Sequence, residues 1–564
     1  MLKSRLCIAF FAFAVGCAPA QKPLTDYVNP MLGTATLWDS VDLGFKPTKR
    51  TWGAEVFPGS SLPNAMVQVS PVTKFHSGAG YQYEDSVIYG FTHTNKGHWN
   101  LCHIPLLPVT GTPTPGDYCS PFSHERESAA PGYYQVFLDR YGVDAQLSST
   151  LRCAFHKYTY PAGAAASLLA DLQRSNEHVR AWDIRKEGDN VFAGWQQTGE
   201  KMYFYAVANR PVTGIEPVVE GDREVRIVRF GEGDGALELR IGFSFVSEKN
   251  ARENLEAEML GKSFAEVRSE ATATWNDLLG RIRVEGGTER EKGLFYSSLY
   301  RSFLWPALRS DVNGEFTDVD GKVINPGFRY YTGPSYWDDY RNKLILLGML
   351  APDVAADVIS SDTDRGEKRG GFMPTFFHGD HASAFVAGTY LRGNRGFDVN
   401  RAYNLVLRNA TVQGPSRPWL DEYIAKGYIS EMDVENPVTW TVCKAAVTKT
   451  LEYSYDDYAV ALLADALGDK ENHDMLMKRT SNYKNLFDPS TGLMRGRLEN
   501  GEWITPFDDQ YPYYEYMYRE ANAWQQAFFA PHDTEGLIGL YPSREAFGAQ
   551  LDKQIGRASC RERV

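Results

Sequence analysis

The sequence has 564 residues and a mass of 63.3 kDa, with 43% hydrophobic and 23% charged residues. This length is too great for one compact domain, and the composition is that of a soluble globular protein. A formal net charge of −12, without a long run of Lys or Arg, excludes nucleic acid and anionic membrane surfaces as natural partners.

The first twenty residues have the features of an export signal. Lys3 and Arg5 precede an apolar run that is too short to anchor the chain in a bilayer. Two processing alternatives remain open. "APA" ending at Ala20 suits soluble release, whereas "AVGC" ending at Cys17 is typical of a bacterial lipoprotein with Cys17 lipidated. We therefore expect signal residues 1–20 and a product that is periplasmic, secreted or held at the outer membrane through Cys17.

Residues 21–262 predict a β-sandwich. Runs such as "YYQVFLDRYGVDAQLSST" and "KMYFYAVAN" alternate or cluster β-branched and aromatic residues, and Gly, Pro, Asn and Asp punctuate them. Many short strands at turn spacing favour a large sandwich. Export permits disulfides, so Cys102 and Cys119 are a candidate pair.

The apolar spacing then changes to that of helices. "ARENLEAEMLGKSFAEVRSEATATWNDLLGRIRV" predicts a helical region, whose residues 263–286 we interpret as a linker. Residues 287–554 predict serial helices, which suggest an α/α toroid, although a helix bundle would give a similar pattern. The tail 555–564, "IGRASCRERV", is abruptly basic, and we interpret it as non-native rather than as a genuine basic tail.

Two stretches place acids beside aromatics near helix starts. In "GPSYWDDYRNK", Trp337 can stack on an apolar ring face, Asp338 can accept hydroxyl hydrogen bonds and Arg341 can orient the acids. In "FMPTFFHGDHASAF", Asp380 and His381 open a helix. The alternative for both stretches is structural, with capping Asp residues and a buried His satisfied by a neighbour.

A third stretch, "MYREANAWQQAFFAPHD", contains Glu520. A Glu walled by Trp524 and Phe528 would lose solvation and keep its proton near neutral pH, as a general acid requires. The alternative is a Glu at a helix edge, paired with Arg519. Other chemistries lack their motifs, because the sequence contains no GxSxG elbow, P-loop, GxGxxG after a strand or zinc-type Cys/His spacing.

In chain order, the motifs "VNPMLGTA", "FPGSSLPNAMVQVSP", "YGFTHTNKGHWNLCHIPLLP", "SYWDDYR", "GFMPTFFHGDHA" and "EANAWQQAFFAPHDTEGLIGL" resemble glycoside hydrolase family 92, the exo-acting, calcium-dependent α-mannosidases of bacteria. The resemblance runs from about Val28 to Gln554. It implies an N-terminal β-sandwich, a six-hairpin α/α barrel, and release of terminal, α-1,2-linked mannose from glycans with inversion. It also implies Ca²⁺ as cofactor.

By the same resemblance, Glu520 is the general acid, and Trp337 and Asp338 line the subsite of the departing mannose. Trp99 is a candidate wall for the next sugar, and Asp380, His381 and Arg341 are candidate substrate-binding residues. The family's Glu-Gly-Asn acid motif reads Glu-Ala-Asn here, with Ala521 in the middle. The family's downstream calcium and base stretches, Asn-Glu-Pro and Gly-Asn-x-Asp, have no counterpart before the sequence ends, so we expect an incomplete barrel, no general base and no activity in this chain.

Rival interpretations are another α/α-barrel carbohydrate enzyme, either a phosphorylase or a lyase, and a non-catalytic glycan-binding lipoprotein. Phosphate-dependent release of a sugar phosphate or formation of an unsaturated product would indicate the former. Glycan binding without turnover would indicate the latter.

Overall fold

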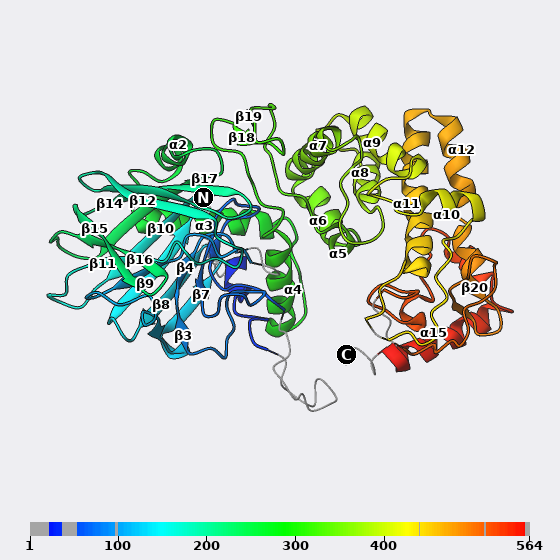
Figure 1. Ribbon diagram of the computed structural model, residues 1–564, viewed down its shortest axis with the longest axis horizontal. Helices are drawn as coiled ribbons and strands as arrows, with labels where there is room; N and C mark the ends of the chain where they lie inside the picture. Colours follow the sequence, from blue (N-terminus) through cyan, green and yellow to red (C-terminus); the bar gives the residue numbers. More distant parts are fainter. Residues whose placement is uncertain (1–21, 37–53, 96–99, 439, 512–514, 559–564) are drawn as a thin grey trace, which may run out of the picture.

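The computed structural model describes residues 22–36, 54–95, 100–438, 440–511 and 515–558. Strands gather in the first half of the chain and helices in the second, in agreement with the predicted order (Figure 1). The described part contains no single helix that is long and apolar enough to cross a membrane. The consecutive helices α6 (Lys343–Leu350) and α7 (Pro352–Lys368) reach that length only together, and they meet at 119°.

Two antiparallel sheets form the N-terminal part, as the sandwich prediction requires. The larger sheet has the order β12-β13-β14-β17-β10-β9-β8-β7, and the other has the order β1-β2-β4-β5-β11-β16-β15. The strands are β1 (Ser60–Ser61), β2 (Gln68–Val72), β4 (Gly90–Thr92), β5 (Leu106–Val109), β7 (Glu127–Ala130), β8 (Tyr133–Leu138), β9 (Val143–Ser149), β10 (Cys153–Thr159), β11 (Ser167–Ala170), β12 (Ala181–Gly188), β13 (Val191–Gln197), β14 (Lys201–Ala208), β15 (Val212–Glu220), β16 (Arg223–Phe230) and β17 (Leu237–Ser244).

Side-chain alternation explains why these sheets face each other. Along β14, Met202, Phe204, Ala206 and Ala208 are buried and the residues between them are half-buried. This period of two sends one set of side chains into the core. Small elements stand along both parts of the chain. They are η1 (Leu24–Tyr27), η2 (His124–Arg126), η3 (Asn482–Leu486), and the two-stranded pairs β3 (Val87–Ile88) with β6 (Ser120–Pro121), β18 (Phe316–Thr317) with β19 (Val323–Ile324), and β20 (Phe487–Asp488) with β21 (Leu493–Met494).

The predicted helical region after the sandwich consists of two helices, α2 (Glu248–Glu258) and α3 (Phe264–Leu279). Ser263 and Glu266 form a capping box that starts α3. Both helices pack on the sandwich, α2 against β17 and β14, and α3 against β9. The segment that we interpreted as a linker is therefore attached to the sheets, and Trp275 Nε1 of α3 donates to the Ser61 carbonyl at 2.7 Å.

The helical part is organised around α11 (Ala446–Leu467), which lies against α8, α9 and α12 (Figure 1). Its 22 residues include buried polar side chains as well as apolar ones, because helices surround it. The remaining helices are α4 (Glu289–Ser302), α5 (Tyr336–Asp339), α8 (Ala382–Leu391), α9 (Val399–Thr411), α10 (Leu420–Lys426), α12 (Lys470–Arg479), α13 (Ala523–Gln526), α14 (Thr534–Ile538) and α15 (Arg544–Ala558).

The stretch from Met517 to Asp533 is mostly irregular, so the alternative that places Glu520 at a helix edge is wrong. Only α13 is helical in it, started by the capping box of Asn522 and Gln525. The disulfide candidate is also wrong, since Cys102 and Cys119 are both free thiols.

Candidate functional site

An aromatic wall stands where α5 meets the loop before α8. The Trp337 ring meets the Phe377 ring edge-on at 5.1 Å. Trp337 is half-buried, and Phe377 is 41% exposed and adopts a φ of +69°. The guanidinium of Arg519 lies 3.7 Å from the centre of the Phe377 ring. The two ring systems, backed by the buried guanidinium of Arg519, form a platform that suits a sugar ring.

Behind this wall, α11 presents two buried carboxylates to His381. Trp337 Nε1 donates to Glu452 Oε1 at 2.8 Å, and His381 Nδ1 lies 2.9 Å from Asp456 Oδ1. His381 Nε2 lies 3.8 Å from Glu452 Oε1. Burial by itself lowers the pKa of His381, but the charges of Asp456 and Glu452 raise it to about 10. The ring is therefore an imidazolium at neutral pH.

Asp380 belongs to a second layer of buried charge. Its Oδ2 accepts from Arg417 Nε at 3.0 Å, and Asn409 donates to its Oδ1 at 2.9 Å. Arg417 also donates to Asp457 Oδ1 at 2.6 Å. Burial raises the pKa of Asp380, and the charge of Arg417 opposes that effect. Such a network holds the start of α8, α11 and the loop of Arg417 together, although Arg417 Nη2 and Asn409 Oδ1 have no hydrogen-bond partner in the described part of the chain.

This placement corrects two of the predicted roles. Asp380 is 0% exposed and His381 is 1% exposed, so neither side chain contacts a substrate in this conformation. Asp456 pairs with His381 and Arg417 pairs with Asp380, both from within the protein. Burial in a polar network describes Asp380 and His381 better than direct sugar binding does, but Asp380 does not cap α8 as the structural alternative expected.

The N-terminal end of α11 adds a buried amine. Lys449 Nζ donates to the Lys444 carbonyl at 2.5 Å and lies 3.3 Å from His378 Nδ1. Burial lowers the pKa of Lys449 to about 8. Burial, together with the charges of Lys449 and Arg519, lowers the pKa of His378 to about 2. The neutral His378 therefore accepts at Nδ1, and its Nε2–H faces Glu515 Oε1 at 3.6 Å.

Glu520 lies on the loop that precedes α13. Arg519 pairs with Glu515, and its backbone N–H donates to Thr448 Oγ1 at 2.9 Å, which ties the loop to α11. Glu520 itself has a φ of +47° and an exposed side chain. A non-glycine residue in this region of backbone space is strained, and such strain gathers at functional sites.

The exposure of Glu520 corrects the expectation of a carboxylate walled in by two rings. Trp524 is buried and donates to Asp509 Oδ2 at 3.0 Å, and Phe528 packs against Phe547. The structural alternative also fails, because Arg519 pairs with Glu515 instead. Ala521 does not have a positive φ, so its backbone conformation does not require the glycine of the family motif.

Asp338 and Arg341 lie at the rim of the wall, and both are exposed. Arg341 Nε donates to the Tyr340 hydroxyl at 2.8 Å, and its guanidinium lies 5.2 Å from the Phe529 ring. The neighbouring Asp339 is buried and bonds Lys343 at 3.1 Å. Of the two adjacent acids, only Asp338 faces solvent, as a substrate-binding carboxylate must.

Trp99 lies outside the described residues. The described residues that follow it, from Asn100 to Ile104, are largely buried, and His103 Nε2 lies 3.0 Å from Thr198 Oγ1. This part of the motif forms a corner of the sandwich core.

No group of three or more His, Cys, Asp or Glu side chains in the described part of the chain is placed to hold a metal ion. The buried carboxylates of the site are instead paired with cations or hydrogen-bond donors, as in Asp456 with His381. The described residues of the site do not fit a calcium centre of that kind.

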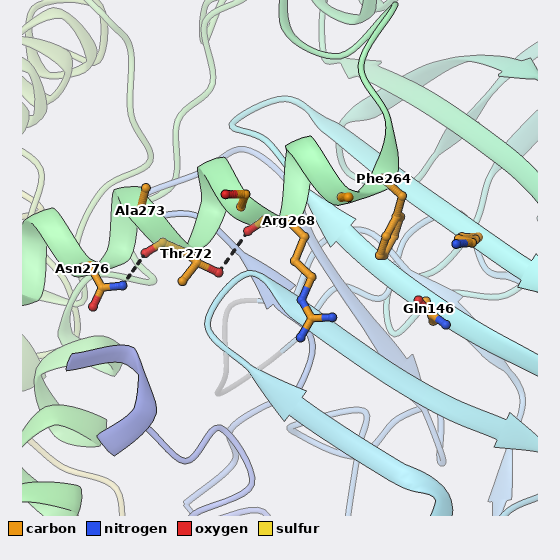
Figure 2. Close-up of a pocket in the computed structure, with 9 residues that line it drawn as sticks. Gln146, Phe264, Arg268, Thr272, Ala273 and Asn276 are labelled. Atoms are coloured by element: carbon orange, nitrogen blue, oxygen red, sulfur yellow. Dashed lines mark hydrogen bonds between the residues drawn. The ribbon is translucent and has the colours of Figure 1, made fainter. Parts of the chain in front are cut away.

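A separate groove of about 630 Å³ runs over α3 on the sandwich (Figure 2). Two of its hydrogen bonds stay within the helix, from Thr272 Oγ1 to the Arg268 carbonyl and from Asn276 to the Thr272 carbonyl, and Asn276 also exchanges hydrogen bonds with Thr25. Phe264 turns into the sheet and is buried. Without polar groups converging on its space, this groove is a weaker candidate than the wall at Trp337.

Comparison with known families decides what scaffold carries the site. The sequence model of the glycosyl hydrolase family 92 N-terminal domain matches residues 27–253, and that of the family's catalytic domain matches residues 250–562. The chain belongs to glycosyl hydrolase family 92. The resemblance of the motifs is thereby confirmed, and the described site lies within the region matched by the catalytic domain.

Solved family 92 structures share the architecture. The α-mannosidase BT3965 from Bacteroides thetaiotaomicron superposes with a TM-score of 0.84 at 27% identity, covering 94% of this chain and 74% of that one. The inverting mannosidase BT2199 from the same organism gives 0.83 at 25%, covering 95% and 74%. An uncharacterized secreted glycosidase of Arthroderma benhamiae is 25% identical, over 93% of this chain and 73% of its own.

Within this family 92 chain, sequence reasoning missed Glu452, Asp456, Lys449 and Phe377. A signal was present for three of them. Lys449, Glu452 and Asp456 are spaced by three and four residues, so they lie on one face of the long helix α11. Charged residues repeated on one stripe of an otherwise apolar helix indicate a buried polar network.

Proposed function

We propose that this family 92 chain is built to release terminal α-linked mannose, with α-1,2 linkage as the expected substrate, by inversion. Glu520 acts as general acid and protonates the leaving oxygen, while a base activates water from the opposite face. Trp337 and Asp338 bind the departing mannose. No described residue is assigned as the base.

One observation carries this proposal. The residue before Glu520, Arg519, lies over the Phe377 ring, which borders Trp337, so the strained loop of the acid is fastened beside the exposed wall. The exposure of Glu520 also leaves its carboxyl open to a leaving group. The mannoimidazole complex of the relative BT3965 supports a mannose-based substrate.

Export is part of the proposal. The signal-like N-terminus and the secreted relative support delivery to the periplasm or outside the cell, with either soluble release or lipidation of Cys17. Residues 1–21 lie outside the described part, so labelled-lipid incorporation into the wild type, compared with Cys17→Ser, separates the two routes.

The base and the calcium that the resemblance implies are proposed to come from sequence outside these 564 residues. About a quarter of the length of the solved relatives has no counterpart here, since the chain covers 74% of them. We therefore expect no release of mannose by this chain. Measurable turnover of an α-mannoside by it would contradict that expectation.

The decisive experiment uses the complete gene. A protein carrying the downstream region should release mannose from α-1,2-mannobiose, lose activity with a calcium chelator, and form the β-anomer first in NMR spectra. Glu520→Gln should lower kcat by about a hundredfold or more, because the leaving group is then not protonated. A sugar phosphate, an unsaturated product or binding without turnover would instead favour the rival functions.

A further inference from the structure

Among the residues that the structure describes, the indole of Trp337 makes one hydrogen bond. Its helix, α5, has only four residues, and its ring is bordered by Phe377, which is itself 41% exposed. The indole N–H donates at 2.8 Å to Glu452, which stands on the 22-residue helix α11. The hydrogen bond to α11 therefore restrains the Trp337 side chain, which the four-residue helix α5 by itself would hold weakly.

Glu452 is a carboxylate that needs its own support. It is 3% exposed, and its Oε2 has no hydrogen-bond partner among the residues that the structure describes. Burying an ionised carboxylate is unfavourable unless a counter-charge is close. His381 Nε2 lies 3.8 Å from the other oxygen of this carboxylate, Oε1. The Nδ1 atom of the same ring lies 2.9 Å from Asp456 Oδ1.

Gly379 packs against both His381 and Glu452. A Cβ at this position would lie 2.6 Å from His381 Nε2 and 3.0 Å from Glu452 Oε2. The residue also has a φ of +66°. Only glycine both adopts this positive φ without strain and has no Cβ to clash with the two side chains. The backbone of the "HGDH" stretch therefore fits around the pair of Glu452 and His381.

We propose that Glu452 is a positioning residue, which orients the sugar-facing indole of Trp337 and is itself held by the neighbouring ring of His381. Glu452 is too buried to contact a glycan, so it acts only through Trp337. The inference rests on the proposed function in one respect, because it takes Trp337 to be the platform for a mannose ring.

The test observes Trp337 directly. The full 564-residue chain is labelled with ¹⁵N in its 12 tryptophan indoles, and the Trp337 signal is assigned by its loss in Trp337→Phe. A hydrogen bond to a carboxylate moves the indole proton downfield and slows its exchange. Glu452→Ala should shift this signal upfield and speed exchange by about tenfold or more. Glu452→Gln, which keeps an acceptor, should give an intermediate shift.

A matched control exists in the same molecule. Trp524 Nε1 donates to Asp509 Oδ2 at 3.0 Å, away from His381. Asp509→Asn should move the Trp524 signal and leave that of Trp337 in place. An unchanged Trp337 signal in both Glu452 variants would overturn the proposal. If Glu452→Ala does not fold, Glu452→Gln alone decides, with the Trp524 signal reporting folding.

Mannoimidazole separates this inference from the proposed function. Its addition to the wild type should perturb the Trp337 signal. In Glu452→Ala, the mannoimidazole concentration needed for the same response should be about tenfold higher. A Trp337 signal that responds to Glu452 variants but not to mannoimidazole would overturn the sugar platform. A signal that responds to mannoimidazole but not to the variants would overturn the positioning role.

Discussion

Two buried histidine sites, one in each part of the molecule, differ in charge. In the sandwich, His93 and His156 face each other with 3.0 Å between their Nε2 atoms, and both are 0% exposed. Burial lowers the pKa of His93 to about 3 and holds that of His156 far below its usual range. In the helical part, His381 is as deeply buried, yet two carboxylates raise its pKa to about 10.

The partners of each ring explain the difference. His93 Nδ1 donates to the Ile104 carbonyl at 2.9 Å, so its Nε2 accepts from His156, whose Nδ1 accepts from the Tyr158 hydroxyl at 2.6 Å. This chain satisfies two neutral rings. His381 instead lies between Asp456 and Glu452. Equal burial therefore yields a neutral pair or a cation, depending only on whether carboxylates are present.

The largest expected effect comes from removing a charge beside His381. Asp456→Asn leaves the imidazolium with one distant carboxylate, and we expect a loss of about 3–5 kcal/mol in the free energy of unfolding. Urea titration followed by circular dichroism measures it. The exposed pair of His473 and Asp474 has the same 2.9 Å distance, and Asp474→Asn should change stability little. Equal effects of the two variants would show that the buried pair is not charged.

The pH dependence of stability should differ in sign between the two sites. The folded chain binds more protons at His381 than the unfolded chain does between pH 6.5 and about 10, so its stabilisation declines as pH rises through that range. At His93 the unfolded chain binds more protons between pH 6.5 and about 3, so stabilisation declines as pH falls.

Calorimetry across pH 4–10 measures both effects, each expected to be a few kcal/mol at most. Lys449 has a lowered pKa and opposes His381 at alkaline pH. The difference between wild type and His381→Asn isolates the contribution of His381. An alkaline slope that is identical in the two proteins would contradict the assigned charge.

A smaller effect is expected in the neutral pair. Tyr158→Phe removes the hydroxyl that bonds His156 and leaves a buried acceptor without a partner, which should cost about 1–3 kcal/mol. Thermal unfolding measures the loss. A loss larger than that of Asp456→Asn would mean that the sandwich, and not α11, contains the more demanding polar network.

The smallest effect on stability is expected at the rim. Asp338 is exposed, so Asp338→Asn should change the free energy of unfolding by no more than about 0.5 kcal/mol. Mannoimidazole binding, followed by calorimetric titration, should nevertheless weaken. A large loss of stability together with unchanged binding would assign Asp338 to the fold and not to the site.

Several features of this protein could be predicted without the structure. The alternation of "KMYFYAVA" and the helical spacing of "VTKTLEYSYDDYAVALLADAL" depend on neighbours a few residues away, and β14 and α11 form where those patterns predict them. The irregular loop of Glu520 was harder to predict, because its course depends on bonds to Thr448 and Glu515.

By itself, the sequence determined the order of a β part before an α part, the long helices and the family. Local periodicity and motif spacing can be recognised from residues that are close together in the sequence, without any information on distant contacts. The tertiary structure decided which acids are buried and which face water. Trp337 and Glu452 are 115 positions apart, and His381 and Asp456 are 75 apart. Charge and exposure depend on such contacts, since solvation and electrostatic interactions are set by distance in space.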